Sequence, residues 1–265
     1  MGTLYLVATP IGNLEDLSAR AVRVLSEVRL IAAEDTRQTG KLLTHFGILT
    51  PLTSYHQHSQ ERKIRQILES LSEGDVALVS DAVTPSLNDP GYELVRAALE
   101  AGYPVSPIPG PSAPIAALVV SGLPTDAFLY LGYLPRKQSE RRRLLEKIAG
   151  LPYTLIFLET PHRLLVALVD LEAVLGDRQA AVAREMTKLF EEIYRGPLST
   201  ARAHFASQEP RGEFTLVIAG AAVQQETWSP ERLRAALQES LAQGLSSSQI
   251  ASQVAARSGW PRREV

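Results

Sequence analysis

The chain has 265 residues, of which 45% are hydrophobic and 21% are charged, and its formal net charge is −2. These values are typical of a soluble globular enzyme with two domains, and the weak net charge confines any nucleic-acid contact to local basic patches. The absence of cysteine excludes disulfides, thiolate nucleophiles, iron–sulfur clusters and cysteine zinc sites. No apolar run approaches the about 20 residues of a membrane span, and the first residues, MGTLYLVATP, have the pattern of a strand, so we expect a cytoplasmic protein.

Short runs of Val, Ile and Leu alternate with helical patterns along the chain, which predicts a largely parallel α/β architecture. Strands are predicted at 3–8, 30–33, 76–79 and 105–108. Helices are predicted at 18–28, from the second strand to Gly47, at 59–71, at 92–101 before Gly102, and from the segment PGPSA to Ser121. We interpret residues 1–121 as an N-terminal α/β domain.

The alternation starts again after the segment SGLPTD, which predicts a second α/β domain over residues 122–224. Strands are predicted at 128–131, 154–158, 180–184 and 214–219, and helices at 140–149 and 161–175. The segment 187–196 is expected to form a turn and then a strand.

The tail, residues 228–265, has a helical pattern of its own. Ser229 and Pro230 match an N-cap followed by proline at the first helical position. This first helix is expected to end at Gly244, and a second helix is expected from Ser247 or Ser248 to Gly259. The pattern predicts a helix-turn-helix-like unit, and the final PRREV resembles the first turn of a further helix, so we expect the unit to be incomplete.

Three loops that follow predicted strands have unusual composition: ATPIGNLED (8–16), SDAVTPSLNDPG (80–91) and PIPGPSA (107–113). Ligands of open α/β sheets bind outside the carboxyl ends of the strands, so three such loops at one edge favour a cleft over merely well-built turns. The chain lacks G-x-G-x-x-G, G-x-x-x-x-G-K-[ST] and G-x-S-x-G, which disfavours dinucleotide-binding, P-loop and hydrolase functions. We expect no metal site and interpret His56 and His58 as surface histidines.

Eight segments resemble one family in order along nearly the whole chain. They are TPIGNLEDLSARA, LIAAEDTRQTGKLL with HFGI, LVSDAVTPSLNDPGYELV, PIPGPSA, SGLPTDAFLYLGYLPRK, ETPHRL, AREMTKLFEE and GEFTLVIAG. The family is the ribosomal RNA small-subunit methyltransferase I type, within the tetrapyrrole-methylase-like superfamily. The resemblance implies two α/β domains with S-adenosylmethionine bound in the cleft between them. It also implies a homodimer that methylates the ribose 2′-hydroxyl of one cytidine in the decoding region of 16S ribosomal RNA in the 30S subunit.

The resemblance assigns cofactor contacts to residues of both domains: Pro10, Asp81, Ala82, Val83, Ser112, Ala113, Leu158, Met186, Phe214 and Thr215. The alternative for Asp81 is an ordinary turn or capping residue. Val83 departs from the family, which has glycine at this position. A glycine with positive φ would make valine strained, whereas extended backbone would make it a pocket wall, and we favour the extended form.

Methyl transfer to a hydroxyl is an in-line displacement, so the enzyme must align oxygen, methyl and sulfur and assist a poor nucleophile. Glu159 ends a predicted strand, His162 follows in ETPHR, and Lys188 lies in REMTK, so these three are our catalytic candidates. Glu34 and Asp35 in AEDTR remain further candidates for the base. Lys188 with Glu185 is equally consistent with an exposed ion pair.

Basic residues of the matching segments suit RNA phosphates, and the segment RKQSERRRLLEK (136–147) is the clearest patch. The candidate RNA contacts are Arg37, Arg136, Lys137, Arg141, Arg142, Arg143, Arg163 and Arg184. The alternative for the run 136–147 is a solvated helix face. Arg257, Arg262 and Arg263 make the tail a second candidate RNA surface, with a structural cap as its alternative.

Two other functions remain open. One is a methyltransferase of the same superfamily that acts on a small tetrapyrrole-like substrate, against which the arginine run and the helical tail argue. The other is a non-catalytic ribosome-assembly module that binds RNA, against which the cofactor loops argue.

Overall fold

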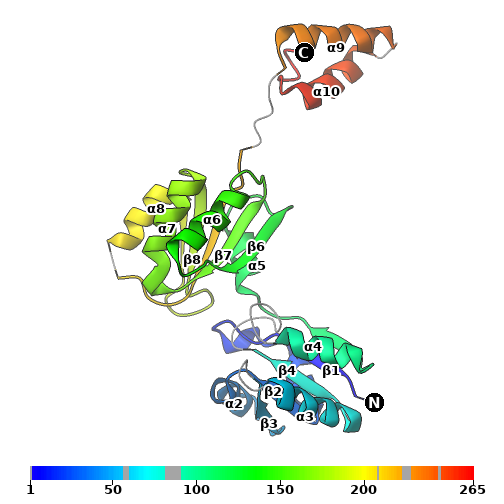
Figure 1. Cartoon of the computed structure of the whole chain (residues 1–265), viewed down its shortest axis with the longest axis vertical. Coiled ribbons are helices and arrows are strands. Elements are labelled where there is room, and N and C mark those ends of the chain that lie inside the picture. The colour runs from blue at the N-terminus through cyan, green and yellow to red at the C-terminus, as the bar shows by residue number, and fades with distance from the viewer. Residues whose placement is uncertain (1, 56–59, 81–90, 208, 223–227, 244–245) are drawn as a thin grey trace. The chain divides into compact units, whose positions relative to one another are not determined.

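The computed structural model describes residues 2–55, 60–80, 91–207, 209–222, 228–243 and 246–265 (Figure 1). The chain divides into two compact units, Met1–Gly220 and Ala221–Val265, and the first unit holds two five-stranded sheets. The α/β class predicted from the sequence is therefore confirmed. No helix within these described ranges combines the length and the apolar character needed to cross a membrane.

The first sheet is parallel throughout and has the strand order β3-β2-β4-β1-β5. Its strands are β1 Leu4–Val7, β2 Leu30–Ala33, β3 Leu52–Ser54, β4 Val76–Val79 and β5 Val105–Ile108. Four of them agree with the sequence prediction to within a residue at each end. The edge strand β3 was not predicted, because three half-buried residues give almost no periodic signal.

Helices cover both faces of the first sheet (Figure 1). Helices α1 Ala19–Glu27 and α2 Thr36–His45 pack on one face, and α3 Gln60–Glu73 and α4 Gly91–Glu100 pack on the other. Strand β4 is buried along its whole length for this reason, which explains its uninterrupted apolar sequence. Helix α1 begins where predicted, because the Ser18 hydroxyl accepts a hydrogen bond from the Ala21 backbone N–H at 3.1 Å.

The second sheet has the order β6-β7-β10-β8-β9 and is mostly antiparallel. Its strands are β6 Phe128–Tyr133, β7 Thr154–Glu159, β8 Gln179–Arg184, β9 Glu192–Pro197 and β10 Phe214–Ile218. Only β6 and β7 pair in parallel, so the expected largely parallel arrangement is wrong for this sheet. The reason lies in the connections: residues 185–191 join β8 to β9, and a parallel pair needs a crossover of about a dozen residues or more.

Helices α6 Gln138–Ile148, α7 Pro161–Leu175 and α8 Leu198–Ala206 cover one face of the second sheet, and α5 Ala113–Val120 covers the other. Sequence reasoning placed α5 in the N-terminal domain, yet its Ala117 and Leu118 pack against Val217 of β10 and its neighbours. Helix α5 is apolar on more than one side, so its own periodicity does not say which sheet it covers. Helix α8 was not predicted.

The tail forms the predicted pair of helices, α9 Pro230–Ala242 and α10 Ser247–Ser258. Ser229 caps α9, and Ser246 forms a capping box with Gln249 at the start of α10. Gly259 ends α10 in the left-handed conformation, with φ of 70°. The expected end of the first helix at Gly244 lies outside the described residues, and residues 262–264 form a turn instead of a third helix.

Candidate active site

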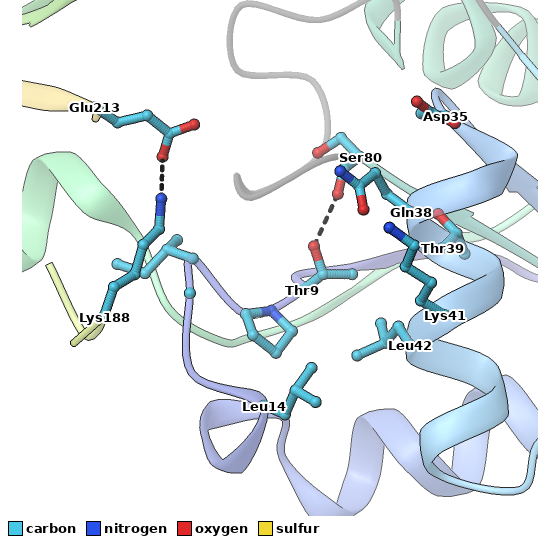
Figure 2. Close-up of a pocket in the computed structure, with 13 residues that line it drawn as sticks. Thr9, Leu14, Asp35, Gln38, Thr39, Lys41, Leu42, Ser80, Lys188 and Glu213 are labelled. Atoms are coloured by element: carbon cyan, nitrogen blue, oxygen red, sulfur yellow. Dashed lines mark hydrogen bonds and ion pairs between the residues drawn. The ribbon is translucent and has the colours of Figure 1, made fainter. Parts of the chain in front are cut away.

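A pocket of about 540 Å³ lies at the carboxyl ends of strands β1, β2 and β4 (Figure 2). The turn after β1, the first half of α2 and Ser80 after β4 form most of its wall. Lys188, which follows β8, and Glu213, which precedes β10, complete the wall. This is the edge of a parallel sheet at which α/β proteins bind their ligands.

The turn after β1 is held in place by a long-range hydrogen bond. The buried Thr9 hydroxyl donates to the Ser80 carbonyl oxygen at 2.8 Å, so the turn is fixed to the end of β4. Pro10 and Ile11, which follow, line the pocket. Of the residues expected to contact the cofactor, Pro10 is the one that lines this pocket within the described part of the chain.

Helix α2 supplies the opposite wall. Its N-cap Asp35 accepts a hydrogen bond from the Arg37 backbone N–H at 2.8 Å and pairs with the Arg37 guanidinium at 3.0 Å. These hydrogen bonds lower the pKa of Asp35, so its carboxylate stays ionised at neutral pH. Gln38 and Lys41, three residues apart, line the pocket from the same face of the helix.

Lys188 lies on the pocket wall between two carboxylates. Its Nζ is 2.9 Å from Glu185 Oε1 and 3.1 Å from Glu213 Oε2, and Figure 2 shows the second contact. Burial alone would lower the pKa of Lys188, but the hydrogen bonds to Glu185 and Glu213 outweigh it and the pKa is raised. Lys188 is therefore an ammonium at neutral pH and cannot accept a proton.

The turn that carries Lys188 has a strained backbone. Glu185 and Thr187 have positive φ values of 49° and 66°, which residues other than glycine rarely adopt. The Glu191 carboxylate accepts a hydrogen bond from the Thr187 backbone N–H at 2.7 Å and holds this shape. The Thr187 hydroxyl is buried and finds no hydrogen-bond partner among the described residues. Strain of this kind is concentrated at functional sites.

Two glycines allow the chain to approach this turn closely. A Cβ on Gly12 would lie 2.4 Å from Lys188 Cγ, and one on Gly212, whose φ is 88°, would lie 2.3 Å from Glu185 Cγ. Real Cβ atoms do not come so near another atom, so a side chain at either position would displace the turn. In the sequence Gly12 is only a lone glycine in TPIGN.

Most of the other expected cofactor residues lie near one another, on the α5 side of the second sheet. Leu158 and Thr215 are paired across β7 and β10, and their side chains share a face with Ile156 and Val217. Met186 is buried in the cluster on that face, against which Ala113 packs. Ile11 belongs to the same cluster and also lines the pocket, so the two groups of residues meet at the turn after β1.

The Phe214 side chain points away from the other expected cofactor residues. The Phe214 ring lies on the opposite face of β10, in the core beneath α7 and α8, with its centroid 5.6 Å from that of Phe205. Its side chain therefore does not face the other expected cofactor residues, because successive side chains of a strand alternate between the faces. Ser112 is the N-cap of α5 but makes no side-chain capping bond. Asp81, Ala82 and Val83 lie outside the described residues.

The structure does not bring Glu159 to the pocket. Its side chain is fully buried on the helix-covered face of β7, where one oxygen accepts from the Thr160 backbone N–H at 2.8 Å and the other lies 3.2 Å from Arg163. Burial raises the pKa of Glu159, against the lowering effect of the Thr160 N–H and Arg163. A carboxylate enclosed in this way cannot reach a substrate hydroxyl in this conformation. His162 is exposed in the first turn of α7.

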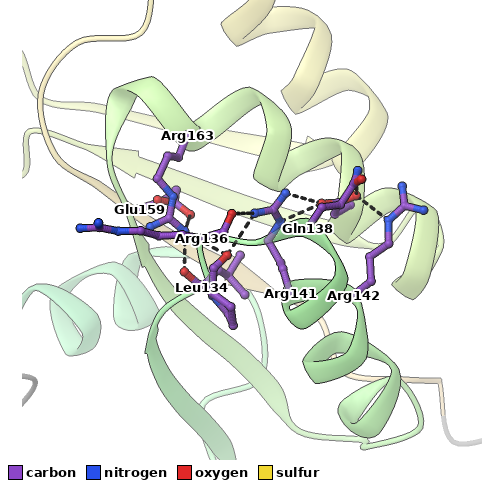
Figure 3. A network of polar contacts seen from close by, with 9 residues as sticks. Leu134, Arg136, Gln138, Arg141, Arg142, Glu159 and Arg163 are labelled. Atoms are coloured by element: carbon purple, nitrogen blue, oxygen red, sulfur yellow. Dashed lines mark hydrogen bonds and ion pairs between the residues drawn. The ribbon is translucent and has the colours of Figure 1, made fainter.

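Arg141 corrects our interpretation of the basic run (Figure 3). It is 4% exposed, and its guanidinium binds the buried Asp170 carboxylate at 2.6 and 2.7 Å and donates to two backbone carbonyls, of Pro135 and Arg136. Arg142, which is half-buried, donates to the other oxygen of Asp170 at 2.7 Å. The expectation that Arg141 faces RNA is wrong, because a guanidinium occupied in this way has no surface left for a phosphate.

The remaining basic candidates divide into two groups. Arg163 donates to the Leu134 carbonyl and pairs with Glu159, and Arg184 donates to the Arg211 carbonyl and pairs with Glu192, so both are largely occupied inside the protein. The exposed group consists of Arg37, Arg136, Lys137 and Arg143. In Figure 3 the Arg136 side chain extends away from Arg141 and Arg142.

Sequence reasoning missed four residues that define the pocket: Gly12, Gln38, Lys41 and Glu213. Gln38 and Lys41 lie within the segment LIAAEDTRQTGKLL, and Glu213 directly precedes a predicted strand, but ordinary polar residues on a helix or before a strand carry no distinctive signal. Among the residues with described positions, no group of three or more His, Cys, Asp or Glu side chains is arranged to hold a metal ion.

Comparison with known proteins agrees with this architecture. The tetrapyrrole (corrin/porphyrin) methylase family matches residues 3–202. Diphthine synthase has a similar fold, with a TM-score of 0.67, 14% identity, and coverage of 83% of this chain and 90% of that chain. Uroporphyrin-III C-methyl transferase from Thermus thermophilus, complexed with S-adenyl homocysteine, aligns with a TM-score of 0.56 and 22% identity, covering 84% of this chain and 99% of that chain. The chain belongs to the tetrapyrrole methylase family.

Relatives with similar sequences identify the group within this family to which the chain belongs. Ribosomal RNA small subunit methyltransferase I of Synechocystis sp. is 51% identical over 268 aligned positions, which cover 100% of this chain and 96% of the relative. The protein of the same name from Escherichia coli O157:H7 is 50% identical over 237 positions, covering 88% of this chain and 83% of the relative. Within the methylase family, the chain belongs to the ribosomal RNA small subunit methyltransferase I group, as its eight segments indicated.

Proposed function

We propose that this protein is an S-adenosylmethionine-dependent methyltransferase of 16S ribosomal RNA, which acts on the ribose 2′-hydroxyl of a cytidine in the decoding region. The observation that carries the proposal is the 51% identity to a ribosomal RNA small subunit methyltransferase I over the whole chain. The likeness to a uroporphyrin-III methyltransferase, at 22% identity, supports the fold alone and does not favour a tetrapyrrole substrate.

The residues on the α5 side of the turn after β1 fit an S-adenosylmethionine site. Ala113, Leu158 and Met186 provide apolar surface for a flat aromatic ring and an alkyl chain, and Thr215 adds a hydroxyl. The buried Thr187 hydroxyl has no hydrogen-bond partner among the described residues, as expected of a group that forms a hydrogen bond to a bound ligand. When bound, the cofactor supplies an electrophilic methyl group. We propose that Pro10, Ala113, Leu158, Met186 and Thr215 hold it, together with the backbone at Ser112 and Phe214 and with Asp81, Ala82 and Val83.

The chain's own contribution to catalysis is mostly positioning. Lys188 is protonated and fixed by two carboxylates, so we propose that it orients the RNA at the pocket and does not act as the base. His162 is exposed and remains a candidate for contact with the substrate. Glu159 would act only indirectly, by holding Arg163.

Four exposed cations, Arg37, Arg136, Lys137 and Arg143, are our proposed phosphate contacts. Arg136 and Lys137 lie in a segment whose backbone carbonyls are held by Arg141 and Arg163, so their positions are defined by buried contacts. In the tail, the guanidinium carbons of Arg232 and Arg257 lie 4.6 and 5.6 Å from the centroid of the Trp228 ring. Arg257 therefore already makes a cation–π contact within the tail. Arg262 and Arg263 remain exposed there.

Several further properties are proposals of the same kind. We propose a homodimer, because α5 exposes Ile115, Val119 and Val120, an apolar surface that a second copy would cover. We also propose the division into domains 1–121, 122–224 and 228–265, and a cytoplasmic location, where 30S subunits are found.

The proposal is tested by incubating undermethylated 30S subunits with the protein and methyl-labelled S-adenosylmethionine, followed by mass mapping of the modified nucleotide. We expect the label on one cytidine ribose of the decoding region. Label on a base would overturn the ribose assignment, and 30S subunits that stay unlabelled would favour the non-catalytic assembly module.

A further inference from the structure

Two polar side chains on the pocket wall have no partner among the described residues of the chain, and both lie on α2. Gln38 and Lys41 line the pocket from α2, and neither makes a side-chain hydrogen bond or an ion pair within the described ranges of the chain. The other charged groups of the wall are occupied: Asp35 by Arg37, and Lys188 by Glu185 and Glu213. An amide and an ammonium are therefore available to a ligand.

The turn after β1, which carries Pro10, lies between this pocket and the proposed cofactor residues of the second sheet. Ile11 packs with Met186 on the α5 side, whereas Gln38 and Lys41 lie across the pocket on α2. The pocket volume of about 540 Å³ falls within the roughly 300–1,000 Å³ of small-molecule sites, which leaves room for a second ligand beside the cofactor.

We infer that this pocket receives one unpaired nucleotide of the RNA substrate, with Gln38 contacting the edge of its base and Lys41 its phosphate. The inference rests on the proposed function and names the site that the target nucleotide occupies. A nucleotide stacked in a helix cannot enter a pocket, so the target must be unpaired or extruded from its helix. The pocket and the proposed cofactor residues meet at Ile11, so a nucleotide in the pocket would have its ribose near the methyl donor.

The chemistry of the two side chains matches a cytidine nucleotide. A glutamine amide offers one acceptor and two donors, and the Watson–Crick edge of cytosine offers an amino donor beside a ring-nitrogen acceptor. An unpaired lysine ammonium suits a phosphate as a compact point charge. Lys188 is less suited to this role, because two carboxylates compensate its charge.

The test compares the full-length protein with Gln38→Ala, Lys41→Ala and, as a control of the same charge on an exposed part of α3, Arg65→Ala. Methylation of undermethylated 30S subunits gives kcat and KM, and calorimetry gives the affinity for S-adenosylmethionine. Calorimetry also measures the binding of cytidine 5′-monophosphate to protein saturated with S-adenosylhomocysteine.

We expect Gln38→Ala to lower kcat/KM by between roughly 5- and 150-fold, the discrimination carried by one good base contact. Lys41→Ala should raise KM and reduce the slope of log KM against log salt by about 1, as for one lost phosphate contact. Both should weaken cytidine 5′-monophosphate binding and leave S-adenosylmethionine affinity unchanged, and Arg65→Ala should behave as wild type.

Other outcomes overturn the inference in distinguishable ways. If wild type methylates 30S subunits but both pocket variants match Arg65→Ala, the nucleotide does not occupy this pocket. If the variants lose S-adenosylmethionine affinity instead, the pocket belongs to the cofactor. If wild type itself leaves 30S subunits unlabelled, the proposed function is rejected, and this inference with it.

Discussion

The lobe built on the second sheet contains two clusters in which cations meet carboxylates, and they differ in almost every physical respect. Arg141 and Asp170 are buried, with 4% and 0% of their side chains exposed, and their contacts join α6 to α7. Lys188, Glu185 and Glu213 are partly exposed; Glu185 and Lys188 belong to a strained turn, and Lys188 and Glu213 line a pocket.

The difference indicates what each cluster does. A buried pair with all its hydrogen bonds made fixes the fold, and removing one partner leaves an uncompensated charge. A half-exposed cluster adds little to stability, so the backbone strain that accompanies it points to a requirement of function. The sequence analysis expected Arg141 on the RNA surface, whereas Arg141 belongs to the buried cluster that fixes the fold.

The largest expected effect is on stability, for Asp170→Ala. The substitution leaves Arg141 buried without its carboxylate, so we expect the free energy of unfolding to fall by about 3–5 kcal/mol. Urea denaturation at pH 7 measures this loss, and Arg142→Ala, which removes a half-exposed partner of the same carboxylate, is the control. Equal losses in the two variants would show that the buried pair has no special role.

The same cluster should respond to acid. Burial alone would raise the pKa of Asp170, but hydrogen bonds from Arg142, Arg141 and Gln138 outweigh it and the pKa is lowered. A lowered pKa in the folded state stabilises the protein above the unfolded-state value of about 3.9 and loses that stabilisation as the pH falls through the folded-state pKa. The stability difference between wild type and Asp170→Asn should therefore shrink below about pH 4; a difference that stays constant there would contradict the assignment.

Lys188→Met should change activity strongly and stability little, in contrast to Asp170→Ala. We expect stability to change by about 1 kcal/mol or less, because the cluster is partly exposed. Methylation of 30S subunits should fall by about 100-fold, the effect of losing a group that positions the substrate. Thermal unfolding and steady-state kinetics on the same preparation separate the two, and an active but unstable variant would assign Lys188 to the fold.

Gly12→Ala tests the close approach between the turn after β1 and Lys188. The new Cβ would lie 2.4 Å from Lys188 Cγ, so Lys188 must shift, and we expect kcat to fall by about tenfold, less than for its removal. Gly40→Ala on α2 is the matched control, because its Cβ meets nothing within 4 Å and alanine favours the helix by roughly 0.5–1 kcal/mol. Wild-type kinetics in Gly12→Ala would mean that the Lys188 position is unimportant.

The smallest effect is expected for Glu159→Gln. The carboxylate is enclosed behind β7 and Arg163 keeps its bonds to the Leu134 and Pro135 carbonyls, so kcat should remain close to the wild-type value across the pH range. A pH–rate profile is the measurement. If the acidic limb of the pH–rate profile disappears in this variant, Glu159 is the base, as the sequence suggested.

Much of the local structure could be predicted from the sequence. Ser229 caps the helix it was expected to cap, the helix predicted at 18–28 begins after Ser18, β4 and β5 span the residues expected of them, and Pro161 begins α7. These features depend on short-range contacts and periodicity, which a sequence carries directly. The eight family segments likewise identified the family, and within them Pro10 and Lys188 were placed at the pocket.

Tertiary structure alone decided which sheet α5 covers, which way the strands of the second sheet run, and which cations are free. Arg141 and Arg143 are two residues apart in one basic run, yet one is buried against Asp170 and the other is exposed, because α7 packs against only one side of α6. The approach of Gly12 to Lys188 joins segments more than 170 residues apart in sequence, and the strained turn at Glu185 and Thr187 is held by contacts with Glu213 and Glu191. By itself the sequence determined the elements and the family, and the long-range packing of those elements determined which polar groups remain available for chemistry.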